Sequence, residues 1–323
     1  MGLRGLLSRL ATRRVHVLVA EAPAAHEVRR ALEQEVCRRG WVLAGAAADA
    51  DLLAVVGSPG RRLGEVVERV WDQLPDPRVR LQVGHVDQVA GALDAARAEL
   101  ADTSRQRDAA RDRPSGPQPG ETDHGEMDHG EMDHGDMAPS GIPLAEGAQD
   151  RDGLEMDVLH LPLGPVLRHW PAGLVLHLTL HGDLVGQARV ERLDEGPRPP
   201  SETGPDRMLD AAASVLDLAG RRQLADRARE LRDPARIAAF RRRVLADRVL
   251  LWGLGGAGSE VVLRLDALLG AAAGELDQTD PRSGAVTDAR LAGLVRGRDL
   301  GEVRLLVATL VPWLEGDREA ADA

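Results

Sequence analysis

A stretch near the middle of this chain sets the strongest limit on its architecture, because it cannot contribute to a hydrophobic core. Residues 104–153 contain few large apolar side chains and many Pro, Gly, Asp and Glu residues. Burial of so little apolar surface cannot offset the conformational entropy lost on ordering, so this composition predicts a disordered acidic linker. The 323 residues then divide into a basic arm at 1–14, a folded domain at 15–103, the linker, and a second domain at 154–323.

The first folded region alternates short apolar runs with amphipathic segments. Strands are expected at residues 15–20, 41–44, 52–56 and 79–83, and helices at 23–39, 61–74 and 86–101. Short apolar runs separated by helices are typical of a mostly parallel sheet that helices cover on both faces. The sequence therefore predicts an α/β fold for this region.

The second folded region combines a hairpin pattern with helical periodicity. Runs at 173–181 and 184–192 flank a Gly182-Asp183 turn, which predicts a β-hairpin. Leu/Ala/Arg periodicity predicts helices at 206–218, 221–231, 234–254, 259–269, 288–295 and 303–314. The pattern indicates an α+β domain in which a hairpin packs on a helix bundle.

Composition excludes several classes of function. The net charge is −11, which argues against a nucleic-acid binder that relies on phosphate contacts. No run approaches the roughly 18–20 apolar residues of a transmembrane helix. We expect a cytoplasmic protein. The basic arm has an apolar stripe, so peripheral association with the inner face of a membrane is one alternative, and a loosely ordered arm is the other.

The chain holds one cysteine, Cys37, and no tyrosine. One thiol cannot form an internal disulfide, and it cannot supply the four thiolates of a usual iron–sulfur cluster. The surrounding helical pattern predicts an inert buried thiol.

Residues 51–84 carry a resemblance to a known family. They read as an apolar strand, a Gly-Ser-Pro-Gly turn, an amphipathic helix that ends in Trp-Asp-Gln-Leu-Pro-Asp-Pro-Arg at 71–78, and a second strand. This arrangement resembles the small subunit of NADH:quinone oxidoreductase (complex I), where a Tyr-Asp-Gln-Met-Pro-Glu-Pro-Arg-like run occurs. The resemblance extends over about residues 15–100. It implies the fold of the subunit that carries the terminal iron–sulfur cluster.

The cluster ligands of that family are not matched here. The family places an adjacent cysteine pair early in the domain, one cysteine after the glycine that Gly84 resembles, and one further on. Here His85 follows Gly84, and the early loop offers only His26. We therefore expect no iron–sulfur cluster. His26 and His85 are expected to be surface or capping residues, the alternative being metal ligands.

Residues 156–185 and 246–255 look like parts of the large quinone-binding subunit of complex I, which is related to the large subunit of NiFe hydrogenases. A Gly-Pro, a short loop with a histidine and a Gly-Leu-x-Leu-x-Leu-x-x-Gly-Asp-x-Val-like run carry the first part. In that family a histidine on this loop and a tyrosine hold the quinone. The resemblance assigns the quinone-binding position to His169, but no tyrosine and no NiFe cysteines are available. A plain structural role is the alternative for His160, His169, His177 and His181.

A five-residue repeat in the linker suggests metal binding. Asp-His-Gly-Glu-Met occurs twice from residue 123 and is followed by Asp-His-Gly-Asp-Met. Imidazole suits copper(II) and nickel(II), and thioether sulfur favours copper(I). The candidate ligands for copper or nickel are His124, Met127, His129, Met132, His134 and Met137. The alternative is a repeat that arose by drift in a disordered segment.

Residues 253–258 match the G-x-G-x-x-G pattern of nucleotide-binding loops. That reading needs a strand before the loop and a second strand that ends in an acidic residue about 20 positions later. The sequence indicates a helix before the motif and no strand after it. A Gly-rich break between packed helices is the favoured interpretation.

The sequence thus supports three hypotheses. The first is a catalytically silent relative of a small–large subunit pair, which acts as an accessory, scaffold or assembly component of a complex I-like or hydrogenase-like system and has no catalytic residues of its own. The second is a copper- or nickel-binding protein that acts through the repeat. The third is a working oxidoreductase module with an unrecognised cofactor.

Overall fold

The computed structural model describes residues 14–113, 148–149, 155–156, 158–194, 204–254, 258–275 and 286–314. Nearly all of the basic arm and the whole five-residue repeat lie outside these ranges. The six candidate metal ligands His124, Met127, His129, Met132, His134 and Met137 therefore lie outside the described residues. None of the described helices is both long enough and apolar enough to span a bilayer.

The first domain is built on a four-stranded parallel sheet in the order β2-β1-β3-β4. Its strands are β1 (His16–Glu21), β2 (Val42–Leu43), β3 (Leu52–Val56) and β4 (Val79–Val83). Its main helices are α2 (His26–Arg38), α3 (Arg61–Gln73) and α4 (Val89–Ala101), with short 3-10 turns at Ala47–Asp49 and Val86–Gln88. The predicted α/β fold is confirmed.

The burial of strand β3 explains why helices cover both faces of the sheet. All five of its residues are buried. Leu52, Ala54 and Val56 pack into the core under α2 and α4, whereas Leu53 and Val55 pack into the opposite core with α3. Successive side chains of a strand point to opposite faces, so a continuous apolar run requires cover on both sides.

The first residues of the predicted disordered linker form a helix. Residues 103–112 form α5 (Thr103–Asp112), although the composition predicted disorder from residue 104. Asp102 caps this helix by accepting hydrogen bonds from the backbone of Ser104 and Arg105. The buried side chain of Gln106 accepts from Arg78 N at 3.1 Å and donates to Glu99 O at 3.2 Å. Caps and single polar contacts order this polar helix, and composition does not record them.

The second domain joins a three-stranded antiparallel sheet, in the order β7-β8-β9, to a layer of helices. The strands are β7 (Val158–Leu163), β8 (Leu174–His181) and β9 (Leu184–Arg192), and a separate pair is formed by β5 (Ala148–Gln149) and β6 (Glu155–Met156). The helices are α6 (Pro205–Leu218), α7 (Arg222–Glu230), α8 (Pro234–Leu245), α9 (Arg248–Gly253), α10 (Gly258–Ala272), α11 (Asp288–Val295) and α12 (Leu300–Leu310). The predicted hairpin with helices is confirmed, and β7 extends it.

The predicted helix at 234–254 is two helices. It breaks at Ala246 and Asp247, and the Asp247 side chain accepts hydrogen bonds from the backbone of Val249 and Leu250. An aspartate in this capping position starts a new helix and redirects the chain.

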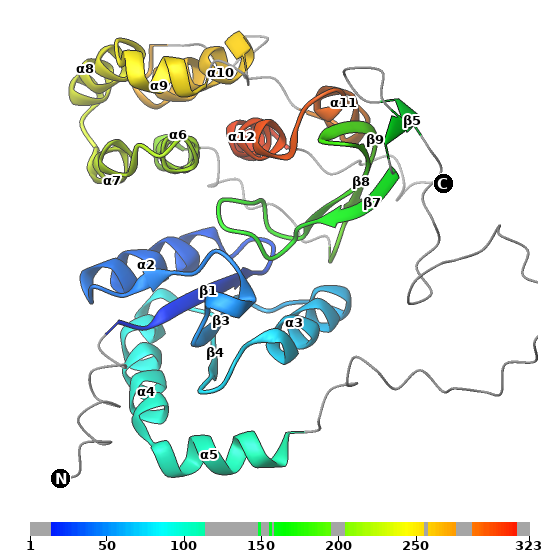
Figure 1. Ribbon diagram of the computed structural model, residues 1–323. Helices are drawn as coiled ribbons and strands as arrows, with labels where there is room; N and C mark the ends of the chain where they lie inside the picture. Colours follow the sequence, from blue (N-terminus) through cyan, green and yellow to red (C-terminus); the bar gives the residue numbers. More distant parts are fainter. Residues whose placement is uncertain are drawn as a thin grey trace, which may run out of the picture.

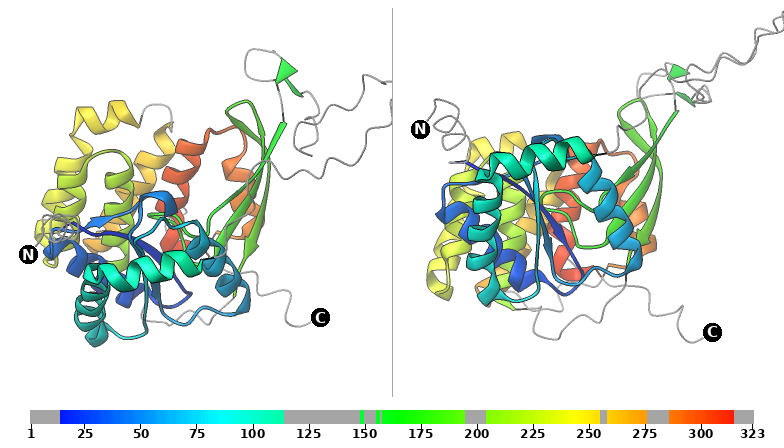
Figure 2. Two further views of the ribbon diagram at one scale, coloured as in Figure 1. Left: turned by 60° about the horizontal axis from the view of Figure 1, so that its bottom comes forward. Right: turned by 90° about the horizontal axis from the view of Figure 1, so that it is seen from below.

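One apolar cluster contains side chains from both domains. Val175 on β8 and Leu193 after β9 are buried together with Leu18, Leu53 and other residues of the first sheet. Figure 1 shows the first domain, in blue and cyan, against the lower side of the second. The views in Figure 2 show that the β7–β9 sheet stands at one side of the helices of the second domain.

A residue of the second domain caps a helix of the first. Asp194 accepts hydrogen bonds from the backbone of Arg62 at 3.2 Å and Leu63 at 2.7 Å, at the N-terminus of α3. A Cβ on Gly60 would lie 2.5 Å from Asp194 Cγ, so this close approach requires glycine. The carboxylate also compensates the positive end of the helix dipole.

We expect Asp194→Ala to lower the free energy of unfolding by about 1–2 kcal/mol, because two backbone donors of α3 lose their acceptor. Urea denaturation followed by circular dichroism would measure this change. Glu65→Ala, on the exposed face of the same helix, is the control and should change stability by less than about 0.5 kcal/mol. Equal stability of Asp194→Ala and the parent protein would contradict the cap.

Candidate functional site

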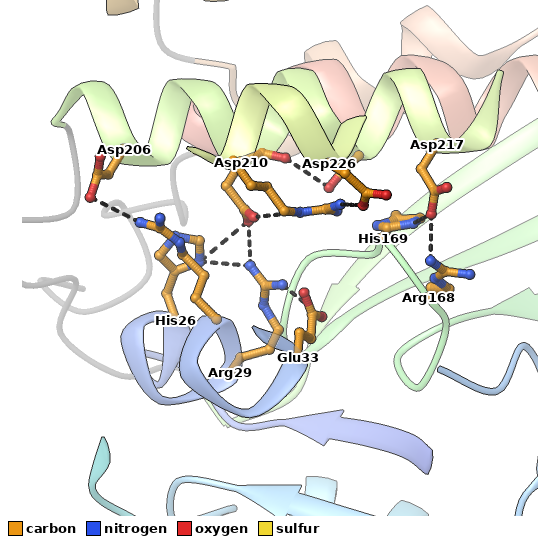
Figure 3. Close-up of polar contacts among 12 residues, drawn as sticks. His26, Arg29, Glu33, Arg168, His169, Asp206, Asp210, Asp217 and Asp226 are labelled. Atoms are coloured by element: carbon orange, nitrogen blue, oxygen red, sulfur yellow. Dashed lines mark hydrogen bonds and ion pairs between the residues drawn. The ribbon is translucent and has the colours of Figure 1, made fainter. Parts of the chain in front are cut away.

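A buried polar seam lies where α2 of the first domain faces α6 of the second (Figure 3). Carboxylates project from α6 toward cationic and imidazole side chains of α2 and of the loop before β8. We use the term seam for this set of residues: Glu21, His26, Arg29, Arg30, Glu33, Arg168, His169, Asp206, Asp210, Asp217 and Arg229.

Arg29 is the centre of one end of the seam. Its guanidinium contacts Glu21 Oε2 at 2.9 Å and Glu33 Oε1 at 2.8 Å, and it donates a short hydrogen bond to Asp210 Oδ2. The side chain of Arg29 is 13% exposed and that of Asp210 is 7% exposed. A single cation therefore serves carboxylates from β1, α2 and α6 and ties the two domains together.

A second ion pair lies beside this centre, nearer to solvent. Arg30 Nη1 is 3.2 Å from Asp206 Oδ2, one turn before Asp210 on α6. Arg30 of the first domain thus pairs with Asp206 of the second, as Arg29 does with Asp210, so the two faces are complementary in charge at these two positions.

Burial and charge act differently on the carboxylates of this centre. Burial would raise the pKa of Asp210, but Arg29 and Arg229 outweigh it and hold that pKa well below its ordinary value. Burial raises the pKa of Glu21 to about 7, although Arg29 opposes the shift. Asp210 is therefore ionised at neutral pH, whereas Glu21 exchanges its proton near neutral pH.

His26 is part of this centre. Burial and the neighbouring Arg29 lower the pKa of His26 to about 3, so its imidazole is neutral at physiological pH. Its Nδ1 atom lies 3.0 Å from Arg29 Nη2, and its buried Nε2 atom has no hydrogen-bond partner among the described residues. The expectation that His26 is a surface residue was wrong, because α6 of the second domain covers it.

His169 and Asp217 form the other end of the seam. His169 Nε2 lies 2.7 Å from Asp217 Oδ2, which also accepts a hydrogen bond from Arg168. The His169 side chain is only 3% exposed, and its backbone adopts a left-handed conformation with φ of 61°. Burial lowers the pKa of His169 despite Asp217, while His169 and Arg168 hold the pKa of Asp217 at about 2 against burial.

The loop before β8 fixes this histidine. Trp170 Nε1 donates a hydrogen bond to Leu174 O at 2.8 Å. A Cβ on Gly164 would lie 2.4 Å from both of these atoms, so only glycine fits. The structure thus places His169, the residue that the sequence assigned to quinone binding, against α6 with its Nε2 atom already bonded to Asp217.

Asp210 and Asp217, the two partners on α6, were not predicted from the sequence. Asp210 and Asp217 are seven residues apart, which places them on one face of the helix, and every residue from Met208 to Leu216 is buried. Two carboxylates at this spacing in an Ala-rich helix are the signal that was available. A buried carboxylate needs a cationic or hydrogen-bonding partner.

The carboxyl edge of the first sheet lies beside the seam. In open α/β sheets, ligands bind at this edge where the strand order reverses, which here is between β1 and β3. At this edge a Cβ on Gly57 would lie 2.7 Å from Ala25 Cβ and 3.1 Å from Ala22 Cβ. The backbone after β3 therefore approaches the loop after β1 closely.

The remaining predicted positions lie apart from the seam. His85 is exposed at the start of the 3-10 turn Val86–Gln88, as expected for a capping residue. His177 bonds to Glu191 on the neighbouring strand, and His160 lies 3.3 Å from Thr179 Oγ1. His160 lies on β7.

Cys37 is not buried as the helical pattern predicted. Val36 takes the inward position on α2, and Cys37 points to solvent. Partial desolvation and the carboxylates of Asp226 and Glu33 raise the pKa of its thiol, which disfavours the reactive thiolate.

The G-x-G-x-x-G segment follows a helix. Residues 248–253 form α9, and α10 begins at Gly258, so no strand leads into the glycines. The helices on both sides agree with the interpretation as a break between helices, and residues 255–257 lie outside the described residues.

Comparison with known proteins gives no relative. No family model, no curated protein and no solved structure matches the chain. Within the described ranges, no group of three or more His, Cys, Asp or Glu side chains is arranged to hold a metal ion. The fold and the seam therefore define the class as a two-domain protein, α/β followed by α+β, that is joined by a buried ionic interface.

Two substitutions should change the pH dependence of stability in opposite directions. The folded pKa of Glu21 is raised from 4.5 to about 7, so its contribution to stability is lost as pH rises through that range. The folded pKa of His26 is lowered from 6.5 to about 3, so its contribution is lost as pH falls through that range. The two effects oppose each other between these ordinary pKa values.

We expect Glu21→Gln to lose stability on acidification from pH 6.5 to 4.5, by roughly 1–3 kcal/mol more than the parent protein. His26→Gln should instead gain stability over the same interval. Urea unfolding at a series of pH values measures both slopes, with the exposed Glu68→Gln as the control. Parallel slopes for all of these proteins would contradict the assignment.

Proposed function

We propose that this chain is a catalytically silent, fused relative of the small and large subunits of a complex I-like or hydrogenase-like enzyme. In this proposal it acts as an accessory, scaffold or assembly component of an oxidoreductase complex, at the cytoplasmic side of the membrane. Its partners are protein subunits of that complex. The proposal starts from the resemblance of residues 51–84 to the small subunit and of residues 156–185 to the large subunit.

The observation that carries the proposal is the contact between Arg29 and Asp210. In the enzymes that the sequence resembles, the small and large subunits bind each other. Here an α/β domain and an α+β domain, in the same order, meet through buried, charge-complementary side chains and a shared apolar core. The buried guanidinium of Arg29 favours this orientation of the domains, because another orientation would leave Asp210 buried without this partner.

The chemistry of the first domain supports the silent part of the proposal. The whole sequence has a single cysteine, which lies on α2 and points to solvent. Four thiolates are required for a usual cluster. The histidines at or near the carboxyl edge of the sheet are the neutral His26 and the exposed His85.

The proposal is tested by purifying the tagged full chain from its native host under mild conditions. We expect subunits of a quinone oxidoreductase or a hydrogenase to copurify, and we expect deletion of the gene to lower the amount of assembled complex on native gels. Arg29→Met, which removes the cation that contacts Glu21, Glu33 and Asp210, should reduce the copurification, whereas the exposed Arg61→Met should not.

Two outcomes would contradict the proposal. A folded chain that retains stoichiometric iron with the visible absorbance of a cluster would make it a working redox module. Unchanged assembly of every respiratory and hydrogenase complex in the deletion strain would remove the accessory role.

The five-residue repeat favours a second candidate function, which is copper or nickel binding. Residues 121–137 hold three His, three Met and seven carboxylates without an arginine. Negative charge attracts cations, and the glycine in each unit allows the chain to wrap around a metal ion.

We expect a peptide of residues 121–137 to bind copper(I) or copper(II) with a Kd tighter than about 10 µM, which corresponds to roughly −7 kcal/mol. Titration calorimetry measures this affinity, and a peptide with the three His and three Met replaced by Ala and Leu is the control. Elemental analysis of the full chain with and without the repeat extends the test to the protein. Equal binding by both peptides would end this candidate.

A further inference from the structure

The short helix α9 leaves most of its apolar side chains in solvent. Leu250 packs inward and is 2% exposed, whereas Val249 is 62% and Trp252 is 86% exposed. Leu251 is 37% exposed, and Leu263 on the following helix α10 is 47% exposed. These two helices thus supply four of the six large apolar side chains that are exposed within the described ranges. Exposed apolar groups with a polar border mark interaction sites.

Arginines border this apolar group. Arg242 and Arg243 in the last turn of α8 and Arg248 at the start of α9 are exposed, and no ion pair joins them to any described residue. Their neighbour Arg241 differs, because it pairs with Asp266 at 2.6 Å and with Glu275 at 2.7 Å.

Asp247, the carboxylate that lies between Arg243 and Arg248 in the sequence, is already engaged. Asp247 caps α9 through its Oδ1 atom and accepts a hydrogen bond from Arg221 through Oδ2. The surface formed by Arg242, Arg243, Arg248, Val249, Leu251 and Trp252, which we call the α9 surface, therefore has a local excess of positive charge. The whole chain, by contrast, has a net charge of −11.

The α9 surface is separate from the seam. In Figure 1, α8, α9 and α10 form the layer of the second domain that lies farthest from the β1–β4 sheet. Side chains of this layer can therefore meet an external partner without disturbing the contact between the domains.

We propose that the α9 surface docks on an anionic lipid bilayer. Tryptophan is enriched at the membrane–water interface, where its ring lies among the head groups. Arginine binds phosphate in a bidentate manner, and clusters of basic residues are attracted to anionic leaflets. A protein partner would need a shaped pocket for a side chain as large and as exposed as Trp252, whereas a bilayer accepts the ring without one.

Both components are needed for a stable contact. A single shallow apolar insertion gives only marginal membrane binding, and a second signal such as a basic cluster makes it persistent. The electrostatic part is screened by salt, so binding should weaken as ionic strength rises.

The test uses the full chain and vesicles of phosphatidylcholine with or without phosphatidylglycerol. We expect the protein to float with the anionic vesicles only, and less of it at high salt. Tryptophan fluorescence gives an internal readout. Trp41, Trp170 and Trp313 are 7%, 7% and 8% exposed, and the guanidinium of Arg78 lies 4.1 Å from the ring centroid of Trp71. A blue shift on addition of vesicles that is lost in Trp252→Ser would therefore report on Trp252.

Matched variants locate the contact. Arg242→Gln with Arg243→Gln, and separately Trp252→Ser, should each lower vesicle binding about tenfold or more. Arg97→Gln with Arg107→Gln removes the same charge from exposed positions on α4 and α5, and Leu159→Ser removes an apolar side chain that is 56% exposed. These controls should bind like the parent protein.

Three results would overturn the proposal. The first is failure of the full chain to float with anionic vesicles. The second is equal vesicle binding by the Arg242/Arg243 and Trp252 variants, which would place the contact elsewhere on the chain. The third is retention of the protein on immobilised polyglutamate without vesicle binding, which would assign the α9 surface to an acidic protein partner.

Discussion

The buried contact of Arg29 with Glu21, Glu33 and Asp210 is the interaction on which the arrangement of the two domains depends. Removing such charges from water costs several kcal/mol per ion, and their mutual attraction roughly offsets that cost. The ionic contact therefore adds little net stability. It does penalise any other arrangement of the domains, because each misplaced carboxylate would remain buried without a partner.

The net stability of the interface comes from its apolar part. Burial of a Val or Leu side chain contributes roughly 1.5–3 kcal/mol. Val175 and Leu193 of the second domain are buried in the core that contains Leu18 and Leu53 of the first. Apolar contacts thus hold the domains together, and the seam fixes their orientation. The cap that Asp194 places on α3 adds a third contact of a different kind.

Local patterns predicted most of the elements, and long-range contacts explain the differences. The strands at 52–56 and 79–83 were predicted at their observed limits, because continuous or alternating apolar runs identify strands directly. Helix α5 was missed because its order depends on Gln106 reaching Arg78 and Glu99. His26 was assigned to the surface because only the distant helix α6 reveals that it is covered. The contact from its neighbour Arg29 to Asp210 on that helix spans 181 residues.

In the candidate site, too, local sequence patterns predicted some features, and long-range contacts decided the others. The sequence resemblance drew attention to His169, but nothing in the local sequence paired it with Asp217 or placed it at 3% exposure. A helix with two carboxylates seven residues apart on a buried face was readable, whereas the identity of their cationic partners was not. Spacing gives the face of a helix, but the packing of a second domain decides what that face meets.

The protonation states of the ionisable side chains in the seam are relevant to the proposed function. Proton-coupled redox chemistry needs a group that both exchanges protons and reaches the substrate. Asp210 and Asp217 are held ionised by their partners, and His26 and His169 are held neutral by burial. Glu21 does exchange its proton near neutral pH, but its carboxylate contacts Arg29. Most ionisable groups of the seam therefore contact one another, whereas His26 Nε2 has no hydrogen-bond partner among the described residues.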